Sequence, residues 1–333
     1  MSERNKSPQL DRLIILLNPA STNHEHAKKY VSEIERLFPK KSTTILQTSP
    51  DGKEATASIL REHASILGPR TLLCIVAGDG TVNFIVNFLL TDESLPKKAR
   101  ATVLLPLWGG NGNDMSTMLN GRPGVSKVKK IFEHGQIVKV KPLYCRMMLE
   151  NQKPALFLAG NCLGFGASGS LCFHLNSKAH RESALLRMPG GTLPQTIATV
   201  WSGLNTSSGF DIFESGTQTT IYERTIYNGP VVAKYYHQPV QLLDDYFYMD
   251  TWHSKIPVTT PLSALLSFQR RTLRRSKNHY FKKAAFTILS EVWAQFDGEP
   301  YKVVSNTKIE IGIYEQPFYA LSMVIKGNDL PAA

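Results

Sequence analysis

Apolar runs and helical periodicities alternate along the first 105 residues of the chain. The runs at 13–17, 43–47, 71–76 and 101–105 predict buried strands, and the stretches near 25–38, 52–65 and 81–90 predict helices between them. In the first of these helices, Ala27, Val31, Ile34 and Leu37 follow helical spacing. Such alternation is typical of a parallel sheet with helices on both faces, which binds ligands beyond the carboxyl ends of its strands.

The second part of the chain changes to short, alternating or apolar runs, which predict an antiparallel β-sandwich or barrel. Helical stretches near 182–202 and 261–275 interrupt these runs, which lie at 137–141, 143–149, 155–160, 219–227, 247–251, 286–296, 308–313 and 318–325. We therefore predict an α/β domain over residues 1–137 and a mainly-β domain over residues 138–333, with the active-site cleft between the two lobes.

A glycine turn joins the third predicted strand to the helix that follows it. Its sequence is Ala77-Gly-Asp-Gly-Thr-Val-Asn83. Gly78 and Gly80 are expected to use backbone angles closed to other residues and to expose their amides, while the helix beginning near Thr81 directs its positive end to the same point. The turn therefore predicts a phosphate site, in which Asp79 would serve a divalent cation or a reacting hydroxyl.

Two further strands end in loops of the same kind. Residues 13–17 run into Asn18-Pro-Ala-Ser-Thr22, and residues 103–106 run into Leu107-Trp-Gly-Gly-Asn-Gly-Asn-Asp114. Late in the chain, Phe296-Asp-Gly-Glu-Pro300 follows a long apolar run and places carboxylates at a tight turn.

These four segments, in this order, resemble the diacylglycerol kinase catalytic domain family, which includes bacterial lipid kinases and the sphingosine and ceramide kinases. In that family an Asn-Pro-x-Ser-Gly loop, a Gly-Gly-Asp-Gly-Thr loop and a Pro-x-Gly-Thr-Gly-Asn-Asp loop line the nucleotide cleft, and an Asp-Gly-Glu completes the site. The resemblance spans residues 12 to about 325. It implies ATP and Mg²⁺ as cofactors, with nucleotide contacts from Asn18, Ser21, Thr22, Gly78, Asp79, Gly80, Thr81, Asn111, Gly112, Asn113 and Asp114.

The loops also depart from the family pattern. Ala77 and Thr22 replace glycines, and Phe84 stands where the family usually carries glutamate. The third loop is longer than in the family, with 108–109 as the predicted insertion, and Asn111 occupies the usual threonine position.

Phosphoryl transfer needs an acceptor hydroxyl in line with the phosphate, and a carboxylate to orient or deprotonate it. We predict that Asp297 has this catalytic role, which the resemblance also implies, and that Glu299 supplies a supporting or nucleotide contact. Asp79 is predicted to position the metal or the acceptor, and in some relatives the matching aspartate is treated as the base. Asp-Gly is also a common hairpin turn, so the motif by itself is ambiguous.

Two other segments have family counterparts. Asp244 and Asp245 resemble an Asp-Asp-Gly segment that helps to hold a structural magnesium, although Tyr246 replaces its glycine. A metal site and a solvated carboxylate pair are both compatible with this sequence. Residues 161–168 resemble a Gly-Phe-Gly-x-Asp/Glu stretch, with Ser168 at the acidic position, and are equally compatible with a plain strand-to-helix turn.

Positive charge is concentrated in one segment of this chain of net charge +11. No Asp or Glu occurs between Thr251 and Ser290, where Lys and Arg contribute eight positive charges. Leucines at 262, 265, 266 and 273 beside Arg270, Arg271, Arg274 and Arg275 predict an amphipathic helix suited to an anionic membrane surface. A solvated helix face is the alternative, and nucleic acid is not expected because no recognised binding motif accompanies the charge.

Composition bears on where the protein acts. No apolar run approaches the roughly 18 to 20 residues that span a bilayer, and the first ten residues contain no signal-like hydrophobic stretch. We therefore expect a cytoplasmic protein with peripheral membrane association. Cys74, Cys145, Cys162 and Cys172 show no Cys-x-x-Cys spacing, which favours reduced, buried thiols over zinc or disulfides.

These patterns together predict an ATP- and magnesium-dependent lipid kinase that acts on the hydroxyl of a membrane lipid, such as a diacylglycerol or a sphingoid base. An NAD kinase-like enzyme, which shares the glycine-rich cleft, is the closest alternative. A catalytically inactive nucleotide- or lipid-binding module is a second alternative, which Ala77, Thr22 and Phe84 would favour. The sequence does not specify the acceptor lipid, and it is compatible with a homo-oligomer.

Overall fold

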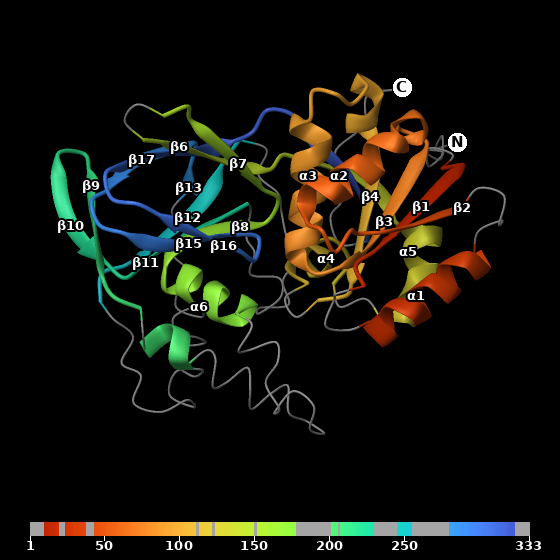
Figure 1. Ribbon diagram of the computed structural model, residues 1–333, viewed down its shortest axis with the longest axis horizontal. Helices are drawn as coiled ribbons and strands as arrows, with labels where there is room; N and C mark the ends of the chain where they lie inside the picture. The colour runs from red at the N-terminus through yellow and green to blue at the C-terminus, as the bar shows by residue number, and fades with distance from the viewer. Residues whose placement is uncertain are drawn as a thin grey trace, which may run out of the picture. The chain divides into compact units, whose positions relative to one another are not determined.

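The computed structural model describes residues 10–19, 24–37, 43–110, 113–121, 124–149, 152–177, 201–205, 207–228, 245–254 and 280–323. These residues form two compact units (Figure 1). The first unit comprises the described residues up to Pro142 and from Tyr314 onward, and the second comprises those between Leu143 and Ile313. Within the described residues, no helix combines the length and apolarity needed to cross a bilayer.

The first unit is built on a six-stranded sheet with the strand order β2-β1-β3-β4-β18-β5. Its first five strands run parallel, and β5 pairs antiparallel with β18. Every residue of the central strand β3 is buried, as expected where helices cover both faces of a sheet. The strands are β1 (Arg12–Leu17), β2 (Thr43–Gln47), β3 (Thr71–Ala77), β4 (Val103–Trp108), β5 (Gln136–Val140) and β18 (Phe318–Ser322).

Helices follow the strands of this sheet and bury their apolar faces on it. Tyr30 and Ile34 of α1 and Ile131 of α5 share one core cluster with alternate residues of β1, β3 and β4. Figure 1 shows α1 and α5 together on one side of the sheet. The helices are α1 (His24–Leu37), α2 (Lys53–Glu62), α3 (Asp79–Thr91), α4 (Asp114–Asn120) and α5 (Val128–His134).

The second unit consists of two six-stranded antiparallel sheets with one apolar core. The rings of Phe165 on β8 and Phe286 on β14 meet edge to face across this core, with centroids 5.5 Å apart. One sheet has the order β10-β9-β14-β17-β6-β7 and the other the order β13-β12-β11-β8-β15-β16. The parallel-sheet lobe and the antiparallel β-lobe confirm the predicted fold class, while the cleft between the lobes stays a prediction.

The strands of the second unit are short. The first sheet contains β6 (Leu143–Met148), β7 (Ala155–Ala159), β9 (Phe210–Glu214), β10 (Thr217–Ile221), β14 (Lys283–Ile288) and β17 (Thr307–Ile313). The second contains β8 (Cys162–Gly166), β11 (Glu223–Tyr227), β12 (Phe247–Trp252), β13 (Tyr280–Phe281), β15 (Val292–Phe296) and β16 (Glu299–Val303).

The helix α6 (Ala167–Asn176) follows β8 and packs on the outer face of the second sheet. A Cβ atom at Gly169 would lie 2.2 Å from the carbonyl oxygen of Trp293 on β15, so only glycine permits this approach. The rings of Phe173 and Trp293 stack beside it with centroids 4.1 Å apart. Residues 161–168 are therefore both a strand and the turn into a helix.

Some of the predicted strand assignments were wrong. The run at 318–325 was assigned to the second lobe, but its strand β18 pairs with β4 and β5 in the first sheet. Most of the run at 137–141, also assigned to the second lobe, is β5 of this same first sheet. The single runs at 219–227 and 286–296 are each two strands that belong to different sheets. In the second case, the backbone amide of Leu289 donates to the carbonyl of Asp211, at the point where the chain leaves one sheet for the other.

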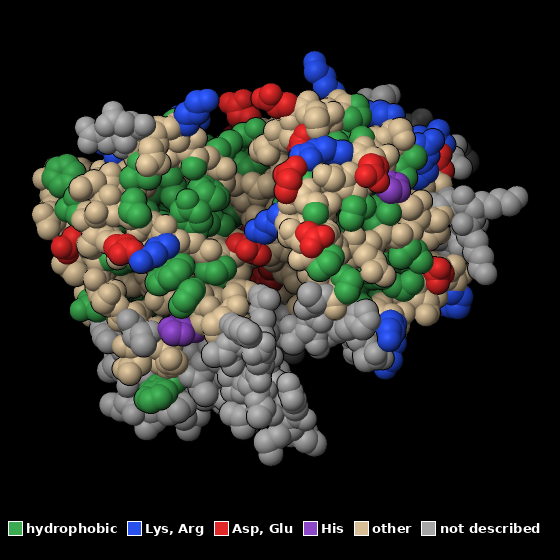
Figure 2. Space-filling view, in the orientation of Figure 1, with side chains coloured by type: hydrophobic (Ala, Val, Ile, Leu, Met, Phe, Trp, Pro, Cys, Tyr) green, Lys and Arg blue, Asp and Glu red, His purple; other side chains and the backbone are tan. Residues whose placement is uncertain are grey.

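The predicted helical stretches near 182–202 and 261–275 lie almost entirely outside the described residues. Among the described residues of the second unit, hydrophobic side chains are exposed in the region of β7 and β16, as Figure 2 shows. Leu156 of β7 and Tyr301 of β16 are each 41% exposed, and Tyr301 packs edge to face on Phe157.

Candidate active site

The three loops that sequence patterns singled out meet at the carboxyl ends of β1, β3 and β4. The side-chain amide of Asn18, after β1, donates a hydrogen bond of 3.1 Å to the hydroxyl of Thr81 in α3. The carboxylate of Asp79, after β3, accepts a hydrogen bond of 3.2 Å from the backbone amide of Met115 at the start of α4. Residues separated by more than 60 positions in the sequence thus form one local structure.

Backbone contact holds the second and third loops together. A Cβ atom at Gly110 would lie 2.4 Å from Cα of Gly78, and a Cβ at Gly109 would lie 2.6 Å from the backbone nitrogen of Ala77. Gly109 and Gly110 are therefore required for this approach. The insertion predicted at 108–109 stays a prediction; in the structure Trp108 is the last residue of β4, and Gly109 is part of the contact.

The expected role of Gly78 and Gly80 was wrong in its detail. Gly78 has an extended backbone, with φ −80° and ψ 171°, and caps a helix that already begins at Asp79. Gly80 lies in the first turn of this helix and is not among the glycines with positive φ. Gly78 therefore has ordinary backbone angles, and it is the missing Cβ atom of Gly110 that permits the close approach of the two loops.

Asn113 closes the third loop with its side chain. It has a left-handed backbone with φ 56° and is 6% exposed. Its side-chain oxygen accepts hydrogen bonds of 3.1 Å from the amides of Gly109 and Gly110, and its nitrogen donates to the carbonyl of Gly110. This side chain thus supports the loop from within, which sequence reasoning did not foresee when it placed Asn113 among the nucleotide contacts.

The arrangement has the chemistry of a phosphate and metal site. The N-terminus of α3, a helix of 13 residues, carries the partial positive charge that favours anions. Asp79 and Asp114 lie in the first turns of α3 and α4, and carboxylate oxygens are ligands that suit Mg²⁺. The predicted contacts Ser21, Thr22, Asn111 and Gly112 lie outside the described residues.

Phe84 has a packing role in α3. Its ring stacks on that of Phe88, one turn further along, with centroids 6.2 Å apart. The guanidinium of Arg61 lies 5.8 Å from the centroid of Phe88. The position at which the resembled family usually carries glutamate is therefore part of an aromatic cluster in this chain.

The carboxylate of Asp297 is buried in the second unit and bound by three consecutive backbone amides. Asp297 is 4% exposed. The amides of Gly160 and Cys162 donate to its two oxygens at 2.6 and 2.7 Å, and the amide of Asn161 lies 3.1 and 3.3 Å from them. Such a run of amides forms a concave anion site, which stabilises the negative charge of this side chain.

The Asp-Gly turn that carries this carboxylate is a two-residue hairpin between β15 and β16. Phe296 pairs with Glu299, and Asp297 and Gly298 both have positive φ, of 45° and 85°, as type I′ loops require. The amide of Gly298 donates to the side chain of Gln295, and its carbonyl accepts from the thiol of Cys172 at 2.8 Å. Glu299, the first residue of β16, is partly exposed.

A second buried carboxylate, that of Glu223, has no sequence signal of its own. It is 1% exposed, and it accepts hydrogen bonds from the amide of Ser168, near the start of α6, and from the hydroxyl of Thr225. The resembled family has an acidic residue at the Ser168 position. Here a carboxylate from the neighbouring strand β11 lies against the same helix terminus, an arrangement that only the paired strands reveal.

The structure adds little evidence on the predicted metal site at Asp244 and Asp245 and on the predicted membrane-binding arginines. Asp245 is exposed before β12, Asp244 lies outside the described residues, and no group of three or more potential metal ligands occurs among the described ones. The stretch with Arg270, Arg271, Arg274 and Arg275 also lies outside them. Burial raises the pKa of the thiols of Cys74 and Cys145, so these two cysteines stay protonated.

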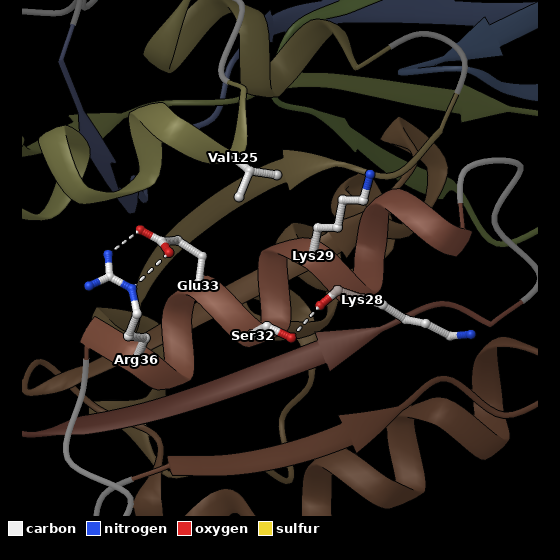
Figure 3. Close-up of a pocket in the computed structure, with 6 residues that line it drawn as sticks. All are labelled: Lys28, Lys29, Ser32, Glu33, Arg36 and Val125. Atoms are coloured by element: carbon white, nitrogen blue, oxygen red, sulfur yellow. Dashed lines mark hydrogen bonds and ion pairs between the residues drawn. The ribbon is translucent and has the colours of Figure 1, made fainter.

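A separate hollow of about 490 Å³ lies along α1 and is drawn in Figure 3. Lys28, Lys29 and Arg36 line it with Val125, and the guanidinium of Arg36 pairs with Glu33 at 2.7 Å. The lining residues do not belong to the three loops described above. The hollow is therefore distinct from the candidate active site.

Comparison with known proteins agrees with this geometry. Residues 12–144 match the family model of the diacylglycerol kinase catalytic domain, which contains all three loops of the first unit. No curated protein matches the sequence.

Two solved bacterial structures share the fold over nearly the whole chain. A diacylglycerol kinase from Bacillus anthracis str. Sterne superposes with a TM-score of 0.58 at 18% identity, covering 95% of this chain and 98% of its own. A second structure from the same organism, described as a candidate diacylglycerol kinase, gives 0.57 at 17% identity, covering 94% and 97%. Yeast NADH kinase complexed with NADH gives 0.47 at 13% identity, covering 96% and 84%.

The backbone contact between the loops predicts the effect of Gly110→Ala. The added methyl group collides with Cα of Gly78, so we expect the free energy of unfolding to fall by about 1–3 kcal/mol, the usual cost of overpacking. Denaturant unfolding of the parent and the variant measures this loss. The matched control is Gly124→Ala, because Gly124 has ordinary backbone angles and space for a Cβ atom. Equal stability of Gly110→Ala and Gly124→Ala would contradict the close packing of the loops.

Proposed function

We propose that this protein, whose residues 12–144 carry the diacylglycerol kinase catalytic domain, is a lipid kinase that transfers the γ-phosphate of ATP to a lipid hydroxyl. The observation that carries the proposal is the meeting of the three loops of this domain in one structure, through the contacts Asn18–Thr81, Asp79–Met115 and Gly78–Gly110. A phosphate site of this kind needs backbone amides, a helix N-terminus and carboxylates in one place.

The loops of the first unit would bind the nucleotide. The helix N-terminus at Asp79 and Gly80 would face the phosphates, and the Asn18–Thr81 hydrogen bond would hold the first loop beside them. Asp79 and Asp114 are the oxygen ligands that would hold Mg²⁺, which when bound spreads the negative charge of the phosphates. The hydrogen bond from Met115 fixes the orientation of the Asp79 carboxylate for this role.

The Asp-Gly-Glu hairpin of the second unit would serve the acceptor. Asp297 would orient or deprotonate the lipid hydroxyl, and the three amides around it would keep its carboxylate in one position. Glu299, beyond the turn, would supply the supporting contact. A carboxylate that is already oriented avoids the reorganisation that a mobile side chain requires in each turnover.

A competition experiment separates this function from its alternatives. The protein is incubated with γ-labelled ATP, Mg²⁺, a mixed lipid extract and NAD, and the products are divided between organic and aqueous phases. We expect the label in an organic-soluble phospholipid, which mass spectrometry then identifies. Label in NADP would establish an NAD kinase-like enzyme, and absence of transfer together with ATP binding would establish an inactive module.

Substitution of the two aspartates tests their roles. Asp79→Asn keeps an oxygen to accept from Met115, so we expect normal stability and a fall in turnover of at least about 100-fold. Asp297→Asn should show a similar loss of turnover, and in addition lower stability, because its amide group faces three backbone donors. Asp51→Asn, an exposed acid of the first unit, is the control. Turnover near the parental value in either active-site variant would remove that residue from the catalytic machinery.

We also propose that the basic segment docks the enzyme on an anionic membrane, where its substrate resides. If Arg270, Arg271, Arg274 and Arg275 approach such a surface, each contributes roughly 1 kcal/mol of attraction. The attraction extends over a screening length of about 8 Å at physiological ionic strength, so added salt should weaken it. This proposal rests on the charge pattern of the sequence alone.

Changing these four arginines to Gln should lower partitioning to anionic vesicles by up to about a thousandfold, measured by co-sedimentation. The charge-matched control changes Arg36, Lys127, Lys129 and Lys130 of the first unit to Gln and should partition like the parent. Equal losses in the two variants would indicate an effect of net charge only. Equal pelleting of the parent and the four-arginine variant would rule out docking through this segment.

A further inference from the structure

The tip of the Asp-Gly-Glu hairpin is held by α6 as well as by the amides that bind Asp297. Gly298 is exposed at this tip. Its carbonyl oxygen accepts hydrogen bonds from two side chains of α6, from the thiol of Cys172 at 2.8 Å and from the amide group of Asn176 at 3.1 Å. Water would satisfy the carbonyl of an exposed turn equally well, so these two donors require a further explanation.

The helix α6 is itself fixed to the sheet that carries the hairpin. At its N-terminal end, the carboxylate of Glu223 on β11 accepts a hydrogen bond of 2.8 Å from the amide of Ser168. In its first turn, the backbone of Gly169 lies directly against the carbonyl of Trp293 on β15, and the ring of Phe173 stacks on the same tryptophan. The helix therefore cannot shift without breaking contacts with β11 and β15.

The donors on α6 are held in register with the turn. Residues four positions apart lie on the same face of a helix, so Cys172 and Asn176 present their side chains together. The side-chain nitrogen of Asn176 carries two hydrogens. It donates to the carbonyl of Cys172, one turn back, at 2.9 Å, and to the carbonyl of Gly298. The bond within the helix thus fixes the side chain that reaches the hairpin.

Gly298 is the point of the hairpin at which the backbone has most freedom. It separates Asp297 from Glu299, and glycine permits more backbone angles than any other residue. The three amides around Asp297 fix its carboxylate, but they do not contact the peptide group between Gly298 and Glu299. The orientation of the Gly298 carbonyl defines that peptide group, and α6 holds this carbonyl.

We propose that Cys172 and Asn176 are positioning residues, whose hydrogen bonds to the carbonyl of Gly298 set the orientation of Asp297 and Glu299 relative to each other. The inference rests on the proposed function and deepens it, because it names the groups that align the two carboxylates for the reaction. Small displacements of an aligned group lower the rate of the chemical step much more than they weaken binding at another site.

Turnover of the donor variants tests this inference. With γ-labelled ATP and a mixed lipid extract, Asn176→Leu should lower kcat by about tenfold, the scale of one hydrogen bond, with the KM for ATP unchanged. Cys172→Ala should show a similar fall. Cys172→Ser should restore the parental kcat, because its hydroxyl also donates, whereas Ser and Ala remove similar packing volume.

Ser177→Ala is the matched control. The hydroxyl of Ser177 donates to the carbonyl of His174 at 2.7 Å, so this variant also loses a hydrogen bond at the C-terminal end of α6, but not one to the hairpin. We expect parental kcat. A loss of kcat in Ser177→Ala equal to that in Asn176→Leu, or equal losses in Cys172→Ser and Cys172→Ala, would overturn the inference in favour of a general packing role for α6.

Amide hydrogen exchange before ATP or lipid is added gives a readout that does not depend on activity. The amides of Asp297, Gly298 and Glu299 should exchange faster in Asn176→Leu and Cys172→Ala than in the parent, and at the parental rate in Cys172→Ser and Ser177→Ala. Unchanged exchange at the hairpin in both donor variants would overturn the inference. Lipid phosphorylation at the parental rate by both would overturn it as well and leave the kinase function standing. Faster exchange in the donor variants of a protein that phosphorylates no lipid would overturn the kinase function instead.

Discussion

Close backbone contact between two glycine loops is the constraint on which the first unit's site depends. The backbones of Gly78 and Gly110 approach so closely that a Cβ atom at Gly110 would collide with the second loop. The contact brings the N-termini of α3 and α4 to the same place, where Asp79 reaches from one loop to the start of the other helix. Asn113 completes the arrangement by binding the backbone of its own loop. Among the described residues, those proposed to bind the nucleotide are thereby held by contacts within the protein itself.

A similar principle governs the acidic hairpin of the second unit. The carboxylate of Asp297 is buried, and three backbone amides replace the water that it loses. Two of these amides, those of Gly160 and Asn161, belong to the turn between β7 and β8, and the third is that of Cys162, the first residue of β8. One short turn therefore holds the acidic side chain in place. A site in which these groups are fixed in advance loses little free energy in reorganisation when the substrate binds.

Local patterns in the sequence predicted more of the first unit than of the second. The alternation of strands and helices predicted β1, β3 and β4 and the loops at their carboxyl ends, because each element has its own periodicity. The assignment of β18 to the first sheet was missed, since an apolar run indicates a strand but not its neighbours. The amide partners of Asp297 lie more than 130 residues away and are backbone groups, which have no sequence signature. The contact of Gly109 with Ala77 was not foreseen, because it exists only in three dimensions.

Hydrogen–deuterium exchange with and without Mg²⁺ and ATP tests most directly whether the three loops form one nucleotide site. The account predicts slower exchange of backbone amides in residues 77–82 and 109–115 and at Asn18 when the nucleotide binds. Exchange in α5 should not change, because this helix contains none of the residues proposed to bind the nucleotide. Binding of ATP that leaves exchange in the three loops unaltered, or that slows it only elsewhere, would contradict the account.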